Sequence, residues 1–299
     1  MNHHFLGISG ARGFVGAALQ EVARREGRKL LLFSRDPSSL PEGRLWSRGK
    51  LPDLHGCDQL IHLAGESILG PWTKKKKELI LESRREGTRA LVEAIAQAPR
   101  KPSVLVSASA IGYYGDRGGM ILEERAASGN GFLAQVAQAW EREALGAQAY
   151  GVRVVLVRIG IVLGPKGGIM KLITPLFRLG LGGVLGSGEQ WMSCIHVHDL
   201  ARLLLQCAND PTLHGPLNAV APTPITNKDF TELMGALLHR PTLLRIPSSL
   251  LQLGLGELST LLLSSQRVVP QKALEHHFHF QYPSVASALE EILTTSPAR

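Results

Sequence analysis

Cysteine is scarce in this sequence of 299 residues, and the cysteines that it has are scattered. Cys57, Cys194 and Cys207 show neither the paired spacing of a disulfide framework nor the close spacing of metal ligands. Disulfide frameworks belong to oxidising compartments, and chains in reducing compartments rarely form them. The sequence therefore excludes a disulfide-stabilised scaffold, and we expect a cytoplasmic protein.

Long apolar runs are also lacking. The most apolar stretch, residues 250–263, is shorter than the roughly 20 residues that a helix needs to cross a bilayer, and Glu257 interrupts it. A basic segment followed by an apolar signal core is not found either. We therefore expect neither a membrane-spanning segment nor a membrane partner.

Aromatic residues make up only 5% of the chain, and they are not interleaved with its one dense basic run, Lys74–Lys77. A groove that stacks nucleic-acid bases needs aromatic side chains beside its cations. The run instead opens a helical pattern and reads as a solvent-exposed helix face. The formal net charge of +8 then fits an anionic small-molecule ligand, and nucleic acid is not expected as a partner.

The most informative segment that is present is a glycine-rich turn near the amino terminus. The apolar run Phe5–Ile8 precedes it, and a helical pattern over residues 15–25 follows it. Gly10 can adopt the positive φ of a tight turn, Gly13 leaves room for a pyrophosphate, and Gly16 lets the helix pack closely on the strand. Free N–H groups at the start of that helix would face the phosphates. This strand, turn and helix predict a dinucleotide-binding site.

The end of the next expected strand, residues 29–33, indicates which dinucleotide is bound. An acidic side chain at this point binds the ribose hydroxyls of NAD. Here Ser34 takes that place, while Arg35 beside it and Arg12 in the turn supply two cations for a 2′-phosphate. We therefore expect NADP(H) as the cofactor. Asp36 is the competing observation, because its carboxylate would repel that phosphate if the strand extended one or two residues further.

Alternating strand and helix patterns predict an α/β fold. Further buried strands are expected at residues 59–64, 102–107, 153–159 and 217–219, and helices at residues 75–97, 131–145 and 198–207. Such an alternation gives a Rossmann-type doubly wound parallel sheet. Ligands of such sheets bind beyond the carboxyl ends of the strands, so the turns at those ends are expected to form one site.

The length of the chain suits a nucleotide domain with a second, smaller part. Residues 1–165, together with about 190–221, are expected to form the NADP-binding Rossmann domain. The glycine-rich segment 166–189 and the proline-rich part 222–299 are expected to form a smaller C-terminal lobe that supplies the substrate site.

Several motifs together resemble a known protein family. They are Ser-Gly-x-x-Gly-Phe-Val-Gly at residues 9–16, Leu-Ile-His-Leu-Ala-Gly at 60–65 and Ser-Ala-Ser-Ala-Ile-Gly-Tyr-Tyr-Gly at 107–115. The sequence is similar to the extended short-chain dehydrogenases/reductases of the NAD(P)-dependent epimerase/dehydratase type. It is most similar to an atypical branch of uncharacterised NADP-dependent epimerase-family proteins with their own C-terminal domain, and the similarity covers essentially the whole chain.

The resemblance implies a set of cofactor-binding residues that extends the glycine turn. Arg84 belongs to this set only through the resemblance, since by its pattern alone it could equally lie on a solvated helix face. The implied residues are Gly10, Ala11, Arg12, Gly13, Phe14, Val15, Ser34, Arg35, Leu63, Ala64, Gly65, Arg84 and Val162.

The catalytic pattern of the family is incomplete in this chain. In most relatives a Tyr and a Lys four residues later share one helix face, where the Tyr exchanges a proton, the Lys lowers its pKa and a Ser holds the substrate oxygen. Phe132 and Val136 occupy the two helix positions here and are most simply core residues. Trp140 and Glu141 lie about one turn further on and do not replace the pair.

Some groups of the usual site are still available. Ser109 is expected to keep the position of the substrate-holding serine, with Ser107 as the alternative. Either Tyr113 or Tyr114 could donate a proton to a carbonyl, and Tyr113 is the candidate, although a tyrosine in such a loop more often has a packing role. Glu66 could orient a substrate or ribose hydroxyl, or simply cap the loop that follows it.

Histidines and large apolar residues near the C-terminal lobe carry weaker signals. His196 and His198 lie on one face of an expected strand end but lack a third ligand, so no metal is expected. Trp191 and Met192 could line the substrate pocket or belong to the core.

The sequence thus predicts an NADP(H)-dependent oxidoreductase or epimerase-like enzyme that acts on a small molecule whose identity it does not reveal. The alternative is an NADPH-binding sensor or interaction protein with little or no turnover, which the loss of the Tyr and Lys pair motivates. A third hypothesis is an interaction module that uses residues 250–263 as an exposed helix face, and burial of that stretch would exclude it. Both a monomer and a homodimer fit the sequence.

Overall fold

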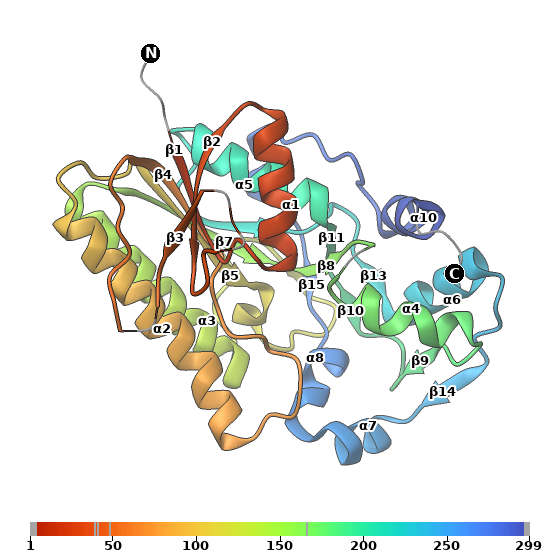
Figure 1. Cartoon of the computed structure of the whole chain (residues 1–299). Helices are drawn as coiled ribbons and strands as arrows, with labels where there is room; N and C mark the ends of the chain where they lie inside the picture. The colour runs from red at the N-terminus through yellow and green to blue at the C-terminus, as the bar shows by residue number, and fades with distance from the viewer. Residues whose placement is uncertain (1–4, 39, 41, 48, 166, 296–299) are drawn as a thin grey trace.

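A seven-stranded parallel sheet forms the centre of the computed structural model, which describes residues 5–38, 40, 42–47, 49–165 and 167–295 (Figure 1). The strand order is β12-β7-β5-β4-β1-β2-β3. The strands are β1 (Phe5–Ser9), β2 (Lys29–Ser34), β3 (Gly43–Leu45), β4 (Cys57–His62), β5 (Val104–Ala110), β7 (Arg153–Ile159) and β12 (Gly215–Ala219). The chain order reverses beside β1, which confirms the predicted doubly wound sheet.

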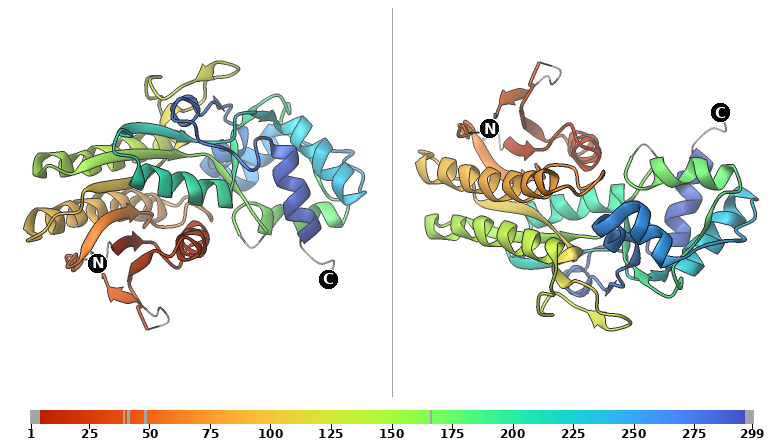
Figure 2. Two further views of the ribbon diagram at one scale, coloured as in Figure 1. Left: turned by 90° about the horizontal axis from the view of Figure 1, so that it is seen from above. Right: turned by 90° about the horizontal axis from the view of Figure 1, so that it is seen from below.

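Two helices cover each face of this sheet (Figure 2). The helices α1 (Phe14–Arg25) and α5 (Val197–Asn209) pack on one face, and α2 (Lys74–Gln97) and α3 (Phe132–Leu145) pack on the other. Side chains alternate along each strand, so each face supplies its own apolar layer. Leu6 and Ile8 belong to the first layer, whereas Leu60 and Leu105 belong to the second.

The boundaries of some strands differ from those expected. Leu63 and Ala64 lie outside β4. The N–H of Leu63 still donates to the carbonyl oxygen of Ser9 at 3.2 Å, but the N–H of Ala64 points to the hydroxyl of Ser9 at 3.4 Å, so the ladder ends there. The strand expected at 102–107 is β5, which begins and ends later, at Val104 and Ala110. The short edge strand β3 has no apolar run and was not expected.

Short elements form the rest of the chain, and several of its strands make separate two-stranded sheets. The strands are β6 (Ile121–Leu122), β8 (Ile161–Leu163), β9 (Gly183–Leu185), β10 (Trp191–Met192), β11 (Cys194–His196), β13 (Ile225–Thr226), β14 (Leu244–Ile246) and β15 (Arg267–Val268). The α-helices are α4 (Met170–Arg178), α6 (Asn227–Leu238), α7 (Ser248–Leu255), α8 (Thr260–Leu263), α9 (Gln271–Glu275) and α10 (Val285–Thr295). The 3₁₀ helices are η1 (Ile111–Tyr114), η2 (Gly146–Tyr150) and η3 (Gly256–Ser259).

The last part of the chain returns to the central sheet. Strand β15 pairs with β6, and Gln266 donates hydrogen bonds to the carbonyl oxygens of Ile111 and Gly115 at 3.1 and 3.0 Å. Further on, Ala273, Phe278 and Phe280 lie in the same apolar cluster as the strands β1 and β12. The C-terminal segment therefore completes the core on the α5 face of the sheet.

Helix α7 is the exception to this packing. None of its residues is buried, and the side chain of Leu253 is 85% exposed. The burial that would exclude residues 250–263 as an interaction surface is therefore not observed for α7. Within the described ranges, the helices are too short or too polar to cross a membrane.

Candidate functional site

The turns that follow β1 and β4 meet at the carboxyl edge of the sheet. Gly10 has a φ of +71°, and a Cβ atom at this position would lie 2.8 Å from the carbonyl carbon of Leu63 and 2.9 Å from the nitrogen of Ala64. Gly13 closes the turn with an N–H···O bond of 2.9 Å to the carbonyl of Gly10, and it is the N-cap of α1. Two segments of the expected cofactor site, 10–15 and 63–65, are thus in direct contact.

A buried histidine fixes the relative position of these two turns. Nδ1 of His62 lies 2.6 Å from the hydroxyl of Ser9, and its Nε2 lies 3.0 Å from the hydroxyl of Thr88 on α2. Burial first, and then the charge of Arg84, lower the pKa of His62 to about 3, so the imidazole is neutral at physiological pH. Sequence reasoning missed this role, although His62 stands inside the Leu-Ile-His-Leu-Ala-Gly motif.

The expected adenosine end of the site lies beyond β2. Strand β2 ends at Ser34, one residue later than expected, and the hydroxyl of Ser34 accepts a hydrogen bond from the N–H of Asp36. The carboxylate of Asp36 pairs with Arg12 at 3.0 Å. Hydrogen bonds from Ser38 and the charge of Arg12 lower the pKa of Asp36. Arg35 is exposed. Because β2 is one residue longer than expected, Asp36 remains the group that competes with a 2′-phosphate at this end.

Arg84 lies against the loop of residues 63–66, and the solvated-face interpretation does not describe it. Its Nη1 donates to the carbonyl oxygens of Glu66 and Ile80 at 3.0 and 3.1 Å, and a Cβ on Gly65 would lie 3.0 Å from its guanidinium carbon. Burial lowers the pKa of Arg84 to about 10, partly offset by the charge of Glu66. No carboxylate of the described residues pairs directly with this cation.

Trp140 on α3 packs beside Arg84. The guanidinium carbon of Arg84 lies 4.9 Å from the centre of the Trp140 ring, and His62 meets the same ring edge-on at 6.3 Å. Trp140 is 6% exposed, and its Nε1 is a buried donor with no hydrogen-bond partner in the part of the chain that the structure describes. Such donors are rare and call for a polar partner.

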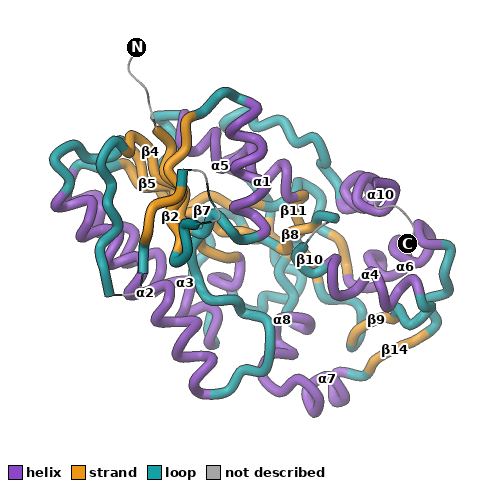
Figure 3. The backbone as a smooth tube through the Cα atoms, viewed as in Figure 1, coloured by secondary structure: helices purple, strands orange, loops and turns teal. Residues whose placement is uncertain are grey.

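The lysine run at the start of α2 is only partly a solvated face. Lys74 and Lys75 are exposed, as expected. Lys76 pairs with Glu66 at 2.7 Å, and Lys77 pairs with Glu257 at 2.8 Å; the two lysine side chains are only 21% and 29% exposed. The interpretation of the whole run as solvent-facing is therefore wrong for its second half. Figure 3 traces the loop that carries Glu66 from β4 to the start of α2.

Phe132 and Val136, the expected positions of the missing Tyr and Lys, differ in their surroundings. Val136 is buried in the core, as expected. Phe132, in contrast, is half-buried at the start of α3. Its ring meets Trp72 edge-on at 5.2 Å and lies 4.7 Å from the Nζ of Lys77. Phe132 therefore contacts the residues around the first turn of α2.

Ser109 belongs to a buried polar network. Its hydroxyl donates a 2.7 Å hydrogen bond to Glu141, and Arg158 binds both oxygens of that carboxylate at 2.8 and 3.0 Å. Arg158 also donates to the hydroxyl of Tyr114, which donates to Asn218 at 2.7 Å. Burial raises the pKa of Tyr114 to about 12, so the phenol stays protonated.

The other two residues of the expected catalytic turn lie close to this network. The ring of Tyr113 stacks on Arg158, with 3.5 Å between the ring centre and the guanidinium carbon, and is half-buried. Its hydroxyl makes no hydrogen bond to any residue in the described ranges. Ser107 is fully buried and donates only to the carbonyl of Ala108 at 3.3 Å. Of the two serines, Ser109 has the stronger hydrogen bond.

Side chains of residues 191–198 contact the C-terminal lobe. Trp191 stacks on Arg267 at 4.2 Å, and the sulfur of Met192 lies 3.7 Å from the amide nitrogen of Asn227. His196 lies 3.1 Å from Glu291, and its ring meets that of His198 edge-on. Among the described residues, no group of three histidines, cysteines or acids could hold a metal ion.

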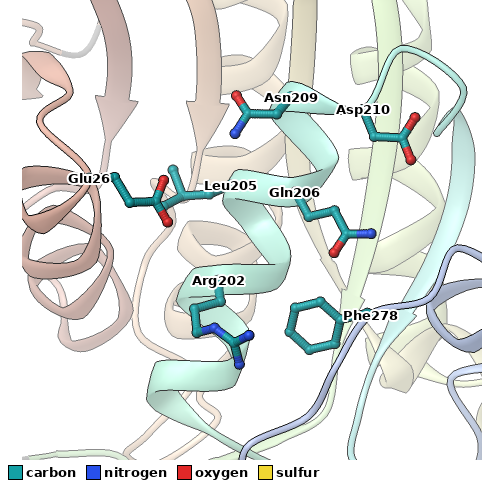
Figure 4. A pocket seen from close by; sticks show the side chains of 7 residues that line it. All are labelled: Glu26, Arg202, Leu205, Gln206, Asn209, Asp210 and Phe278. Carbon is teal, nitrogen blue, oxygen red and sulfur yellow. The ribbon is translucent and has the colours of Figure 1, made fainter.

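One hollow of about 450 Å³ lies away from this edge (Figure 4). The ends of α1 and α5 that border it precede strands, so they lie at the amino edge of the sheet. It is lined by Glu26, Arg202, Leu205, Gln206, Asn209, Asp210 and Phe278. Its lining shares no residue with the expected site.

Comparisons with known proteins agree with this arrangement. Residues 6–218 match the model of the NAD dependent epimerase/dehydratase family, and residues 246–292 match a domain of unknown function, DUF1731. The chain is 36% identical to the epimerase family protein YfhF of Bacillus subtilis, over 96% of this chain and 97% of that protein.

Two solved structures are similar over nearly the whole chain. A crystal structure of the human epimerase family protein SDR39U1 with NADPH has a TM-score of 0.90 at 33% identity, and covers 98% of this chain and 100% of that one. The nucleoside-diphosphate sugar epimerase of Corynebacterium glutamicum has a TM-score of 0.81 at 34% identity, and covers 97% of this chain and 58% of that one.

Proposed function

Because the chain belongs to the NAD dependent epimerase/dehydratase family, we propose that it is an NADP(H)-dependent oxidoreductase or epimerase-like enzyme acting on a small molecule. The family membership confirms the resemblance that the sequence motifs predicted. The observation that carries the proposal is the contact of Gly10 with Leu63 and Ala64, where a Cβ atom would collide with backbone. This packing places the free N–H groups at the start of α1 beside the turn after β4, where a pyrophosphate is bound in such folds.

NADP(H) is the cofactor that the side chains support best. The human relative was solved with NADPH. Strand β2 ends at Ser34, and the residue that follows it directly is Arg35 and not an acid. For Arg12 to bind a 2′-phosphate, it must exchange its contact with Asp36. Both partners of that pair are more than half exposed, so the exchange costs little.

The remaining residues of the set are proposed to contact the rest of the cofactor. Among the described residues, Arg84 is a half-buried cation without a carboxylate partner, and Trp140 has a buried donor without a hydrogen-bond partner. Both fit an oxygen-rich ligand at the loop of residues 63–66. The nicotinamide supplies hydride transfer when it is bound. Ser109 gives its proton to Glu141, so it can only accept a hydrogen bond from substrate or cofactor. Tyr113, whose hydroxyl is uncommitted, is the proposed proton donor.

We also propose that two parts of the chain have different binding roles. Residues 1–165 and about 190–221 hold the cofactor, and residues 166–189 and 222–299 supply the substrate side. The partner is a small molecule, without nucleic acid or membrane, and the protein acts as a monomer or homodimer. Its three cysteines are buried free thiols, which supports a cytoplasmic location.

A second candidate is an NADPH-binding sensor or interaction protein with little or no turnover. Phe132 and Val136 favour it, because neither side chain exchanges protons. The exposed leucines of α7 offer such a protein a surface for a partner.

Cofactor binding tests the first step of the proposal. Fluorescence titration is expected to show tighter binding of NADPH than of NADH. Arg35→Ala should weaken NADPH about tenfold and leave NADH unchanged, since one charge-assisted contact to the phosphate is lost. Arg25→Ala, an exposed arginine on α1, is the matched control and should change neither. Equal binding of NADH and NADPH by the unaltered protein would refute the phosphate argument.

Turnover separates the two candidates. The NADPH complex is incubated with a panel of carbonyl compounds and sugar nucleotides while nicotinamide absorbance is followed. Turnover that Tyr113→Phe abolishes, with NADPH affinity unchanged, supports the enzyme and its proton donor. Tight NADPH binding with silence across the panel supports the sensor.

A further inference from the structure

The inner face of α2 carries three cations in its first turns. Lys76, Lys77 and Arg84 are all half-buried, and Arg84 lies about two helical turns after Lys77. The N-terminus of a helix is already partly positive, so lysines there lower stability unless anions meet them. The first turn of α2 contains no acidic residue. The anions that meet these lysines must come from elsewhere.

Two carboxylates from distant parts of the chain fill this role. Glu66, just after β4, pairs with Lys76. Glu257 lies 180 residues beyond Lys77, on η3 of the C-terminal lobe, and both of its oxygens are within 2.9 Å of the Lys77 ammonium. Lys77 is thus the cation at which α2 meets the C-terminal lobe.

The ammonium of Lys77 also lies beside two aromatic rings. Its Nζ is 4.7 Å from the ring centre of Phe132, and Trp72 packs on the same ring at 5.2 Å. Phe132 holds the place that a catalytic Tyr has in most relatives. The ammonium of Lys77 and the ring of Phe132 therefore lie where those relatives have the phenol of the tyrosine.

The contact between Lys77 and Glu257 is open to competition. The side chain of Glu257 is 52% exposed, and η3 directly follows α7, which has no buried residue. An ion pair this exposed is weak in water. An anionic ligand can replace the Glu257 carboxylate without leaving a buried charge unpaired.

We infer that the Lys77 ammonium recognises an acidic group of the substrate, a carboxylate or a phosphate, whose place the Glu257 carboxylate holds until the substrate binds. The inference rests on the proposed function, since it gives the substrate class for the same site. The expected substrate has an acidic group close to its reacting carbon. It also has a flat or apolar part that packs on Trp72 and Phe132.

Calorimetry on the NADPH complex tests this with benzoylformate for the carboxylate, phenyl phosphate for the phosphate, and methyl benzoylformate as the neutral control. At least one of the two acids is expected to bind and the ester is not. Lys77→Gln should weaken the acid about tenfold, through loss of one charge-assisted contact. Glu257→Gln should strengthen it about threefold, because the internal competitor is gone. Lys74→Gln, exposed in the same helical turn, is the matched control and should have no effect.

Three results would overturn the inference. They are equal affinity for acid and ester, equal weakening in Lys74→Gln and Lys77→Gln, and failure of both acids to bind either the unaltered protein or Glu257→Gln. NADPH affinity is measured separately for each protein. A protein that does not bind NADPH contradicts the proposed function, whereas normal NADPH binding with any of the three results contradicts only the substrate class.

Discussion

The hydroxyl of Ser109 donates to Glu141, and the same carboxylate holds Arg158 through both of its oxygens. Glu141 and Arg158 are each less than a tenth exposed, so this ion pair is shielded from water. Ser109, which is expected to keep the position of the substrate-holding serine, is therefore anchored by a charge pair between α3 and β7. The Glu141 carboxylate accepts the hydrogen bond of the Ser109 hydroxyl and so fixes the orientation of that hydroxyl.

Removing the charge of Glu141 is expected to destabilise the fold strongly. In Glu141→Gln the buried guanidinium of Arg158 loses its counter-charge, which costs about 3–5 kcal/mol in the free energy of unfolding. The measurement is urea denaturation followed by circular dichroism. Glu143→Gln, also on α3, breaks the more exposed pair with Arg89 of α2; it is the control and should cost about 1 kcal/mol or less. A similar loss in both variants would show that the Arg158 pair has no special weight.

A methyl group on Gly10 is expected to abolish dinucleotide binding. Gly10→Ala puts a Cβ 2.8–2.9 Å from the backbone of Leu63 and Ala64, so the two turns must move apart. Gly27→Ala is a close control, because Gly27 has nearly the same φ, +70°, but nothing within 4 Å of the added atom. Both variants bear a backbone strain of about 1 kcal/mol, yet only Gly10→Ala should lose NADPH in a fluorescence titration. Unchanged NADPH affinity in Gly10→Ala would contradict the role given to this contact.

Stability is expected to fall in acid because of His62. The folded pKa of His62 is about 3, below the 6.5 of the unfolded chain, so the unfolded state binds the proton first. This contribution is complete above pH 6.5 and is lost as the pH falls toward 3. At pH 5 the loss is about 2 kcal/mol.

The measurement is the free energy of unfolding at pH 7 and pH 5. His62→Asn is less stable at pH 7, since it loses contacts to Ser9 and Thr88, but its decline between the two pH values should be smaller than that of the unaltered protein by about 2 kcal/mol. His55→Asn, at an exposed position, should decline as the unaltered protein does. If the free energy of unfolding fell by the same amount between pH 7 and pH 5 in all three proteins, the acid sensitivity would come from groups other than His62.

The central sheet was predictable because its strands are buried on both faces. Runs such as residues 153–159 are almost wholly apolar, and that strand has the expected bounds. Strands as short as β3 and β14 leave no such pattern, since two or three half-exposed residues match many conformations. Their partners, moreover, are set by how distant segments fold together.

Within the candidate site, the geometry of the glycine turn was predictable from local backbone chemistry. The spacing of Gly10, Gly13 and Gly16 predicts this turn, because tight turns and close packing require glycine at fixed positions. The hydrogen-bond network around Arg158 was not predicted from the sequence, although an arginine inside an apolar strand could have indicated it. The inward direction of Lys77 depends on Glu257, far along the chain, and no sequence window contains both residues.

The return of the last segment to the central core limits how this protein can be recombined. Phe278 and Phe280 fill the space beside α5, so the apolar interior that supports the glycine turn is built from both ends of the polypeptide. A chimaera that takes its final eighty or so residues from a relative would import foreign side chains into that interior. We therefore expect such a chimaera to be stable only when the residues of α5 that contact Phe278 and Phe280 are exchanged with the segment.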